Sequence, residues 1–169
     1  ALAGQRKYME LGGIQHGSER VFVLSTTHGG KTHAFAAAIA TINTYKNEPV
    51  IETLYRIGGR LKHEGNQIIA NHGLSDFVEI EGKPCCLVVK TLNQKRERCQ
   101  AMRTLFLQET IRRGVLMTSL VVSYTHSDDD VDKTLNAIDE ALSVYKQALE
   151  HGVEKYLIGP PSQAVYRKF

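Results

Sequence analysis

The sequence predicts an α/β fold, a two-layer sandwich in which helices cover a small, mainly antiparallel sheet. Three observations lead to this prediction. Apolar residues recur at helical spacing in long segments, two short apolar runs flank a turn of glycine and proline, and a further apolar run follows the next helical segment. The order helix, hairpin, helix, strand, helix is typical of two layers packed around one core.

The first elements are a short strand, a glycine turn and a helix. The apolar run Val21–Leu24 predicts a buried strand, and small residues predict a helix from about Lys31 to Tyr45. Between them lies the polar turn Ser25–Gly30. A glycine turn beside a helix start presents unpaired backbone N–H groups and a partial positive charge. The segment therefore predicts an anion site, with a phosphate as the expected ligand.

A long helix and a hairpin follow. Pro49 is compatible with a helix start, and apolar residues at helical spacing predict a helix from Val50 to about Asn71, which His72-Gly73 ends. Phe77–Glu81 alternates and Cys85–Val89 is apolar, so both are expected to be strands of an antiparallel pair. We expect the turn between them at Gly82-Lys83-Pro84.

A basic run, a helix and a third strand come next. Residues 93–103 carry four basic side chains without interleaved aromatic residues, so a solvated loop and helix start is expected rather than a nucleic-acid site. The helix that contains Met102 and Phe106 is expected to stop at Gly114, and Val115–Ser123 is predicted to be a third strand. The basic side chains are Lys95, Arg96, Arg98 and Arg103.

The last helix has a clear start and stop. Ser127 and Asp130 have nearly the spacing of a capping box, and Asp128–Asp130 lies in the first turn, where the helix dipole favours acids. Capping explains these aspartates without a metal, and His126 is expected to be a hydrogen-bonded turn residue. Gly152 is the expected end, and the tail beyond it is expected to be an extended arm. The apolar stripe is Val131, Leu135, Ile138, Leu142, Tyr145 and Leu149.

Composition limits the function classes. The chain has 169 residues, enough for one domain with a core, and is 42% hydrophobic and 23% charged. A net charge of +3 does not indicate nucleic acid, and no apolar run reaches the roughly 20 residues of a membrane span. Cys85, Cys86 and Cys99 are odd in number and lack zinc spacing. We therefore expect a cytoplasmic protein with no nucleic-acid or membrane partner.

One interpretation of the glycine turn is a nucleotide phosphate loop, which has the pattern G-x-x-x-x-G-K-S/T. Gly30, Lys31 and Thr32 match its second half. Ser25 stands where the first glycine should turn the chain out of the strand, and no apolar strand ending in a magnesium-binding aspartate follows. A nucleotide-binding α/β protein that uses Ser25 to Thr32 is therefore an alternative function.

Three separated segments resemble one enzyme family. They are residues 1–9 (ALAGQRKYM), residues 25–42 (STTHGGKTHAFAAAIATI) and residues 123–130 (SYTHSDDD). In this order they resemble class III (fold type I) pyridoxal-phosphate aminotransferases, most closely the glutamate-1-semialdehyde 2,1-aminomutase branch. The resemblance covers nearly the whole chain and implies the C-terminal fragment of such an enzyme.

The resemblance implies a role for the glycine turn. In this family a Thr-x-x-Gly turn gives a threonine hydroxyl and backbone N–H groups to the phosphate of the pyridoxal 5'-phosphate (PLP) held by the partner subunit. The matching residues are Thr27, with N–H groups near His28, Gly29 and Gly30. The alternative is that Thr26 and Thr27 only cap the helix, and that His28 is structural.

The resemblance also divides the chain. It implies that residues 1–30 are the tail end of a large cofactor-binding domain, residues 31–47 an interdomain helix and residues 48–169 a small C-terminal domain. The Schiff-base lysine and the aspartate on the pyridine nitrogen would lie upstream of Ala1, so no catalytic residue is expected in this chain, and the fragment alone is expected to be inactive. The full-length enzyme would be a homodimer with small-molecule amino donors and acceptors.

Two positions depart from the aminomutase pattern. Lys31 and Thr32 stand where many members carry Asn-Pro or a pair containing Glu, and Thr118 lies near an acidic position of the aminomutases. The substrate is therefore open: another amino acid, a keto compound or an amino sugar. A non-catalytic interaction domain, which would bind neither cofactor nor nucleotide, is a further alternative.

Overall fold

The computed structural model describes residues 4–12, 17 and 31–163. Contacts within the chain divide it into two units, residues 1–47 and residues 48–169. The predicted strand Val21–Leu24 and the glycine turn Ser25–Gly30 lie outside the described residues. The first unit contains α1 (Arg6–Met9), a short 3-10 helix (Glu10–Gly12) and α2 (Thr32–Asn47). The helix predicted after the glycine turn is confirmed as α2.

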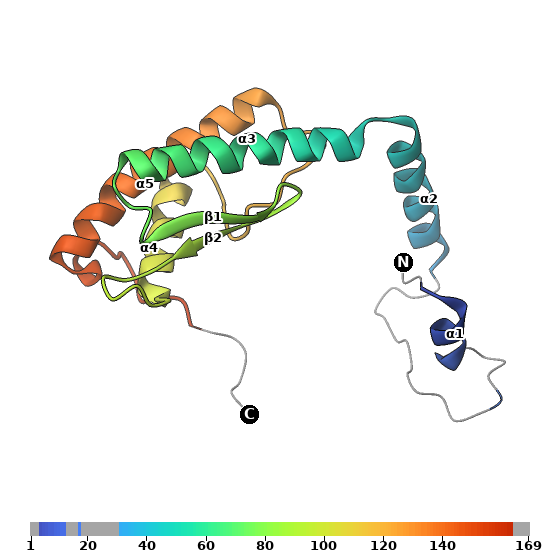
Figure 1. Ribbon diagram of the computed structural model, residues 1–169, viewed down its shortest axis with the longest axis horizontal. Helices are drawn as coiled ribbons and strands as arrows, with labels where there is room; N and C mark the ends of the chain where they lie inside the picture. Colours follow the sequence, from blue (N-terminus) through green and yellow to red (C-terminus); the bar gives the residue numbers. More distant parts are fainter. Residues whose placement is uncertain (1–3, 13–16, 18–30, 164–169) are drawn as a thin grey trace. The chain divides into compact units, whose positions relative to one another are not determined.

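The second unit contains the packed core. Figure 1 shows its hairpin lying under α3, with α5 beside that helix. The predicted α/β class is confirmed, since helices pack against a small antiparallel sheet. In chain order its elements are α3 (Val50–Asn71), β1 (Val78–Lys83), β2 (Cys86–Thr91), α4 (Gln100–Arg112), α5 (Asp128–His151) and the 3-10 helix Val153–Lys155.

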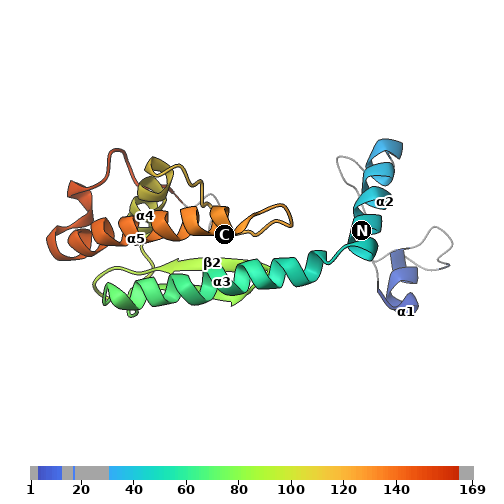
Figure 2. The same cartoon turned by 90° about the horizontal axis from the view of Figure 1, so that it is seen from above.

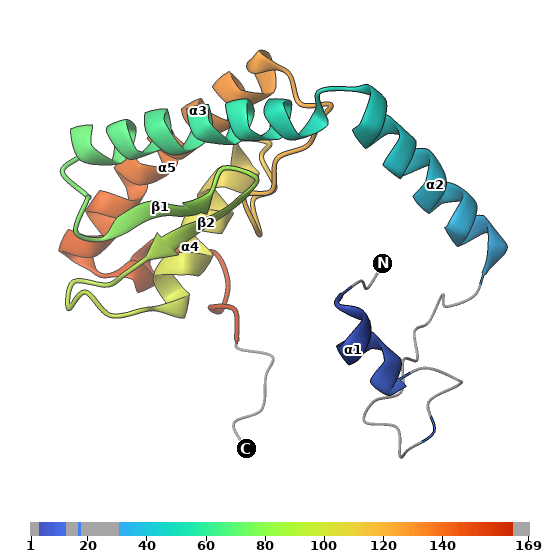
Figure 3. The same ribbon diagram turned by 45° about the vertical axis from the view of Figure 1, so that its right-hand side comes forward.

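Helix α3 has the bounds that the sequence predicts, with Pro49 before it and His72 after it. Its buried residues recur about every four positions, as Ile57, Leu61 and Ile69 do, and so form one face. This face packs on the hairpin and on α5. Figure 3 shows the hairpin below α3 from a second direction.

The hairpin is confirmed, but its turn lies further along the chain than predicted. Lys83 pairs with Cys86, so the two-residue loop is Pro84-Cys85, and Gly82 is part of β1 opposite Leu87. The predicted turn Gly82-Lys83-Pro84 is therefore wrong. Proline fits the loop because its missing N–H is not needed there for a ladder hydrogen bond.

The predicted third strand Val115–Ser123 is wrong. Its pairing with the sheet is one isolated bridge between Leu120 and Leu87, and the described sheet has two strands. The reason lies in the spacing of its buried side chains. Met117, Leu120 and Val122 are buried, and the step of three between the first two breaks the alternation that a ladder requires. The segment is anchored by side chains instead.

Helix α5 begins and ends as the sequence predicts. The Ser127 hydroxyl accepts a hydrogen bond from the Asp130 N–H (3.2 Å), and the Ser127 N–H donates to the Asp130 carboxylate (2.8 Å), which completes the capping box. Gly152 ends the helix with a φ of 92°. Every residue of the predicted apolar stripe is buried. Within this stripe the Tyr145 hydroxyl donates to the Leu92 carbonyl at 2.6 Å, which ties α5 to the end of the hairpin.

Helices α3 and α5 run side by side in the same direction, as Figure 2 shows from above. Two side-chain contacts agree with this direction. Arg56, near the start of α3, forms an ion pair with Asp128 at the start of α5 (3.0 Å), and the His72 ring, just after α3, is hydrogen-bonded to Asp139 further along α5 (2.6 Å). Among the described helices, none combines the length and the apolar composition that crossing a membrane would require.

Candidate functional site

The four residues predicted to bind the cofactor are Thr27, His28, Gly29 and Gly30, and all lie outside the described residues. The described chain resumes at residue 31, and α2 begins at Thr32. The Lys31 carbonyl accepts the first helical hydrogen bonds, from the N–H groups of Ala34 and Phe35 at 3.0 and 3.2 Å. The helix start that an anion site next to the glycine turn requires is thus present.

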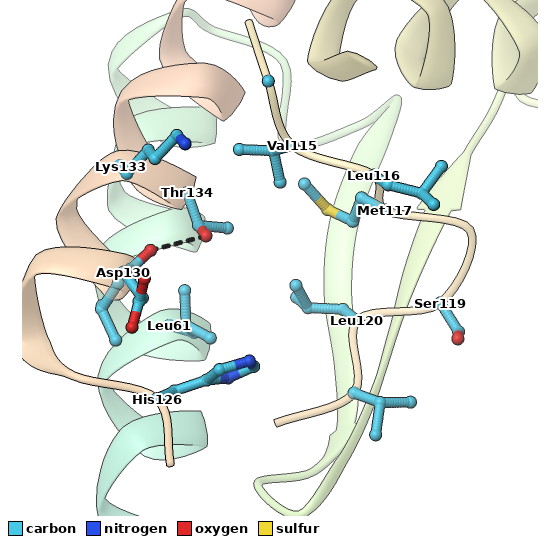
Figure 4. Close-up of a pocket in the computed structure, with 13 residues that line it drawn as sticks. Leu61, Val115, Leu116, Met117, Ser119, Leu120, His126, Asp130, Lys133 and Thr134 are labelled. Carbon is cyan, nitrogen blue, oxygen red and sulfur yellow. Dashed lines mark hydrogen bonds between the residues drawn. The ribbon is translucent and has the colours of Figure 1, made fainter. Parts of the chain in front are cut away.

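A pocket of about 240 Å³ opens between the start of α5 and the segment 114–121 (Figure 4). One side is apolar and includes Val115, Met117 and Leu120 of the segment 114–121, whereas Leu61 of α3 lies near Asp130 and His126. The other side carries His126, Asp130, Lys133 and Thr134. In Figure 4 these polar side chains come from α5 and the loop before it, and face the apolar side across the pocket.

Three polar residues of this pocket, His126, Asp130 and Thr134, hold the start of α5. The His126 Nδ1 accepts the Ser123 N–H at 3.2 Å, as expected for a hydrogen-bonded turn residue. The Thr134 hydroxyl donates to the Asp130 carbonyl at 2.7 Å (dashed line in Figure 4). Hydrogen bonds from the backbone and hydroxyl of Ser127 hold the pKa of the Asp130 carboxyl below its usual value. These groups build the helix start and form no nucleophile–base pair.

An ion-pair cluster joins α3 to α5. The Arg60 guanidinium bonds Glu64 (2.8 Å), Asp128 (3.3 Å) and Asp132. The hydrogen bond from Arg56 is the main cause that lowers the pKa of Asp128, with Arg60 adding to it. The aspartates at the start of α5 thus serve capping and ion pairing. In the described ranges no group of three or more His, Cys, Asp or Glu residues is arranged to hold a metal ion.

The three cysteines are free thiols. Cys85 lies in the hairpin loop and Cys86 at the start of β2, while Cys99 precedes α4. Cys86 is exposed and the other two are half-buried.

No family model matches this chain. In sequence it is similar to the 3-aminobutyryl-CoA aminotransferase of Cloacimonas acidaminovorans (strain Evry), with 25% identity over 152 residues. The match covers 88% of this chain and 35% of that protein. The chain is similar to an aminotransferase. It spans about a third of that relative's length.

In structure the chain is similar to the FumI protein of Sphingopyxis sp. MTA144, which was solved in its PLP internal aldimine form. The TM-score is 0.63 and the identity 22%, over 78% of this chain and 31% of that protein. At this identity the likeness establishes a shared fold. The matched part of this chain therefore shares its fold with part of that protein.

Proposed function

We propose that this chain is the C-terminal part of a PLP-dependent class III aminotransferase that moves an amino group on an amino-acid or keto substrate. The observation that carries the proposal is the similarity to an aminotransferase over 88% of the chain. The shared fold with a PLP protein supports it. The order of the three resembling segments supports it from the sequence.

In this proposal the chain contributes half of a phosphate cradle. Thr27 donates its hydroxyl to the cofactor phosphate, and backbone N–H groups near His28, Gly29 and Gly30 donate beside it. The start of α2 at Thr32 fits such a cradle, because its positive end directly follows the turn. PLP, when bound, supplies the electron sink that lets the amine be exchanged.

The rest of the proposed enzyme lies outside this chain. The chain spans 35% and 31% of the two similar proteins, so a larger cofactor-binding domain is proposed to supply the lysine and the aspartate that hold PLP. The complete enzyme would be a homodimer in which the turn serves the neighbouring subunit. The 169-residue chain alone would then catalyse no transamination, and turnover by the purified chain would contradict the proposal.

The cofactor assignment is tested by two substitutions in the complete polypeptide that carries this chain. Thr27→Ala should weaken PLP binding about tenfold or more, because a hydrogen bond to a charged group contributes about 1.5–3 kcal/mol. Thr26→Ala is the matched control and should leave the affinity within about twofold. PLP affinity is measured by titrating the apoenzyme and following cofactor absorbance. If the two substitutions changed the PLP affinity equally, the threonines would only cap the helix and the assignment would be wrong.

The reaction class is tested by the need for an acceptor. An aminotransferase releases product only when a separate keto acceptor is supplied, whereas an aminomutase moves the amine within one substrate. We expect the complete enzyme to depend on the acceptor, since the similar protein is named an aminotransferase. The substrate panel should contain β-amino acids both free and as coenzyme A thioesters. Product formation without an acceptor would instead identify an aminomutase.

A further inference from the structure

A second pocket lies beside β2, at the start of α4. It has a volume of about 390 Å³ and is separate from the pocket in Figure 4. Its lining includes three basic residues: Lys90 from β2, Arg98 from the loop, and Arg103 from α4. No role is assigned to these residues by the proposed function.

The pocket carries an excess of positive charge. Lys90, Arg98 and Arg103 line it together with one carboxylate, Glu81. The Lys90 ammonium forms an ion pair with the Glu79 carboxylate (3.6 Å), and the Arg103 guanidinium donates one long hydrogen bond (3.4 Å) to the Thr118 carbonyl. Arg98 makes no side-chain hydrogen bond or ion pair with any described residue. Because the guanidinium groups of Arg98 and Arg103 are forked donors, this lining suits an oxyanion.

The position of Arg98 is fixed by the loop before it. The Asn93 side-chain oxygen accepts the N–H groups of Lys95 (2.9 Å) and Glu97 (3.0 Å). A β-bridge between Leu92 and Arg98 then closes the loop. The backbone of Arg98 is therefore held against the end of the hairpin, next to the pocket.

The start of α4 points to the same ligand chemistry. Cys99 precedes the helix without a side-chain capping bond, and the first turn contains no acidic residue. Both Cys99 and Gln100 line the pocket. The partial positive charge of the helix start therefore adds to that of the three cationic side chains.

We propose that this pocket binds the phosphate group of a small phosphorylated molecule. Arg98 and Arg103 bind the phosphate oxygens, and Lys90 adds charge. A phosphate is preferred to a carboxylate because it carries up to two negative charges and more acceptor oxygens for this set of donors. The proposal does not depend on the transaminase function, since it uses none of the residues assigned to PLP.

The test is calorimetric titration of the full chain with inorganic phosphate and with ADP, and with succinate as a carboxylate of similar charge. We expect saturable binding of phosphate or ADP, and binding of succinate at least tenfold weaker. Binding of phosphate alone indicates a site for a free or small phosphate ester, and tighter binding of ADP indicates a nucleotide. No saturation by about 10 mM of either probe would overturn the proposal, as would equal binding of succinate.

Three variants localise the binding. Arg98→Gln and Arg103→Gln should each weaken it about tenfold, because each removes a charged donor to the phosphate oxygens. Arg96→Gln is the matched control, because it removes one positive charge from the same loop at a residue that bonds Asp76 (2.7 Å) and does not line the pocket. It should leave affinity within about twofold. If all three variants lost the same affinity, the phosphate would be attracted by the overall positive charge of the loop, and the proposed site would be refuted. If Arg98→Gln fails to fold, Arg103→Gln decides.

Discussion

Two adjacent glycines in α3 show how much one position in this fold depends on its neighbours. Gly58 is buried, and a Cβ atom added there would lie 1.8 Å from the Pro84 carbonyl oxygen. A Cβ atom at Gly59 would meet nothing within 4 Å. The backbone of α3 thus presses on the hairpin loop at one glycine only, and a side chain there would force the two elements apart.

The two glycines give a matched pair of substitutions. Gly58→Ala should lower the free energy of unfolding by about 1–3 kcal/mol, because overpacking outweighs the gain in helix propensity. Gly59→Ala should raise it by about 0.5–1 kcal/mol through propensity and chain entropy. Urea denaturation of both variants measures the difference. If both alanines stabilise the protein, α3 does not approach Pro84 as described.

At the scale of elements, a buried carboxylate links α4 to α5. Glu109 is 3% exposed and accepts hydrogen bonds from Gln108 (2.9 Å) and Arg113 (2.7 Å). Arg113 in turn bonds Glu140 of α5 at 2.6 Å. Burial by itself would raise the pKa of Glu109, but the hydrogen bonds from Gln108 and Arg113 outweigh it and hold the pKa below its usual value.

This arrangement predicts a pH-dependent contribution to stability. A carboxyl group with a lowered pKa in the folded state stabilises the fold above its unfolded pKa and loses that contribution as pH falls through the folded pKa. Glu109→Gln should therefore lower the free energy of unfolding by about 1–3 kcal/mol near neutral pH. The difference in this free energy between wild type and variant should become smaller between about pH 5 and about pH 3. Urea denaturation at a series of pH values measures it, and a constant gap would contradict the pairing.

The control for this prediction is Glu140→Gln, which removes the other carboxylate from Arg113. The Glu140 side chain is 65% exposed. Because exposed ion pairs contribute little, this variant should cost under about 1 kcal/mol at any of these pH values. If Glu140→Gln lowered the free energy of unfolding more than Glu109→Gln, the main interaction between the helices would be the exposed ion pair.

At the scale of the whole molecule, the core belongs to one of the two units. The buried core residues described lie between Ile57 and Val153. Helix α2 of the first unit buries none of its residues, and its exposed side chains include Phe35, Ile39 and Ile42. The second unit, residues 48–169, therefore has what independent folding requires.

A truncation tests this independence. A chain of residues 48–169 should unfold in a single cooperative transition with the urea midpoint of the full chain, because the first unit contributes no described core residue. The chain contains no tryptophan, so circular dichroism and tyrosine fluorescence can both follow the transition. A lower midpoint, or transitions that differ between the two probes, would show that residues 1–47 stabilise the rest.

The sequence by itself determined the elements whose signals are local. The bounds of α3, the capping box of Ser127 and Asp130, the stop at Gly152 and the apolar stripe of α5 were all predicted, because helix periodicity and capping act within a few residues. The Thr27–Gly30 cradle stays a prediction, since those residues lie outside the described part of the chain.

Only the tertiary structure decided what depends on distant residues. Val115–Ser123 is apolar enough for a strand, but its buried side chains pack without the alternation that a ladder needs. Gly58 has a role only because Pro84 lies against it. Likewise Lys90 and Arg98 looked unrelated in the sequence, and the loop closed by Asn93 brings them to one pocket. Contacts between distant residues depend on how the elements pack, and local sequence patterns do not encode that packing.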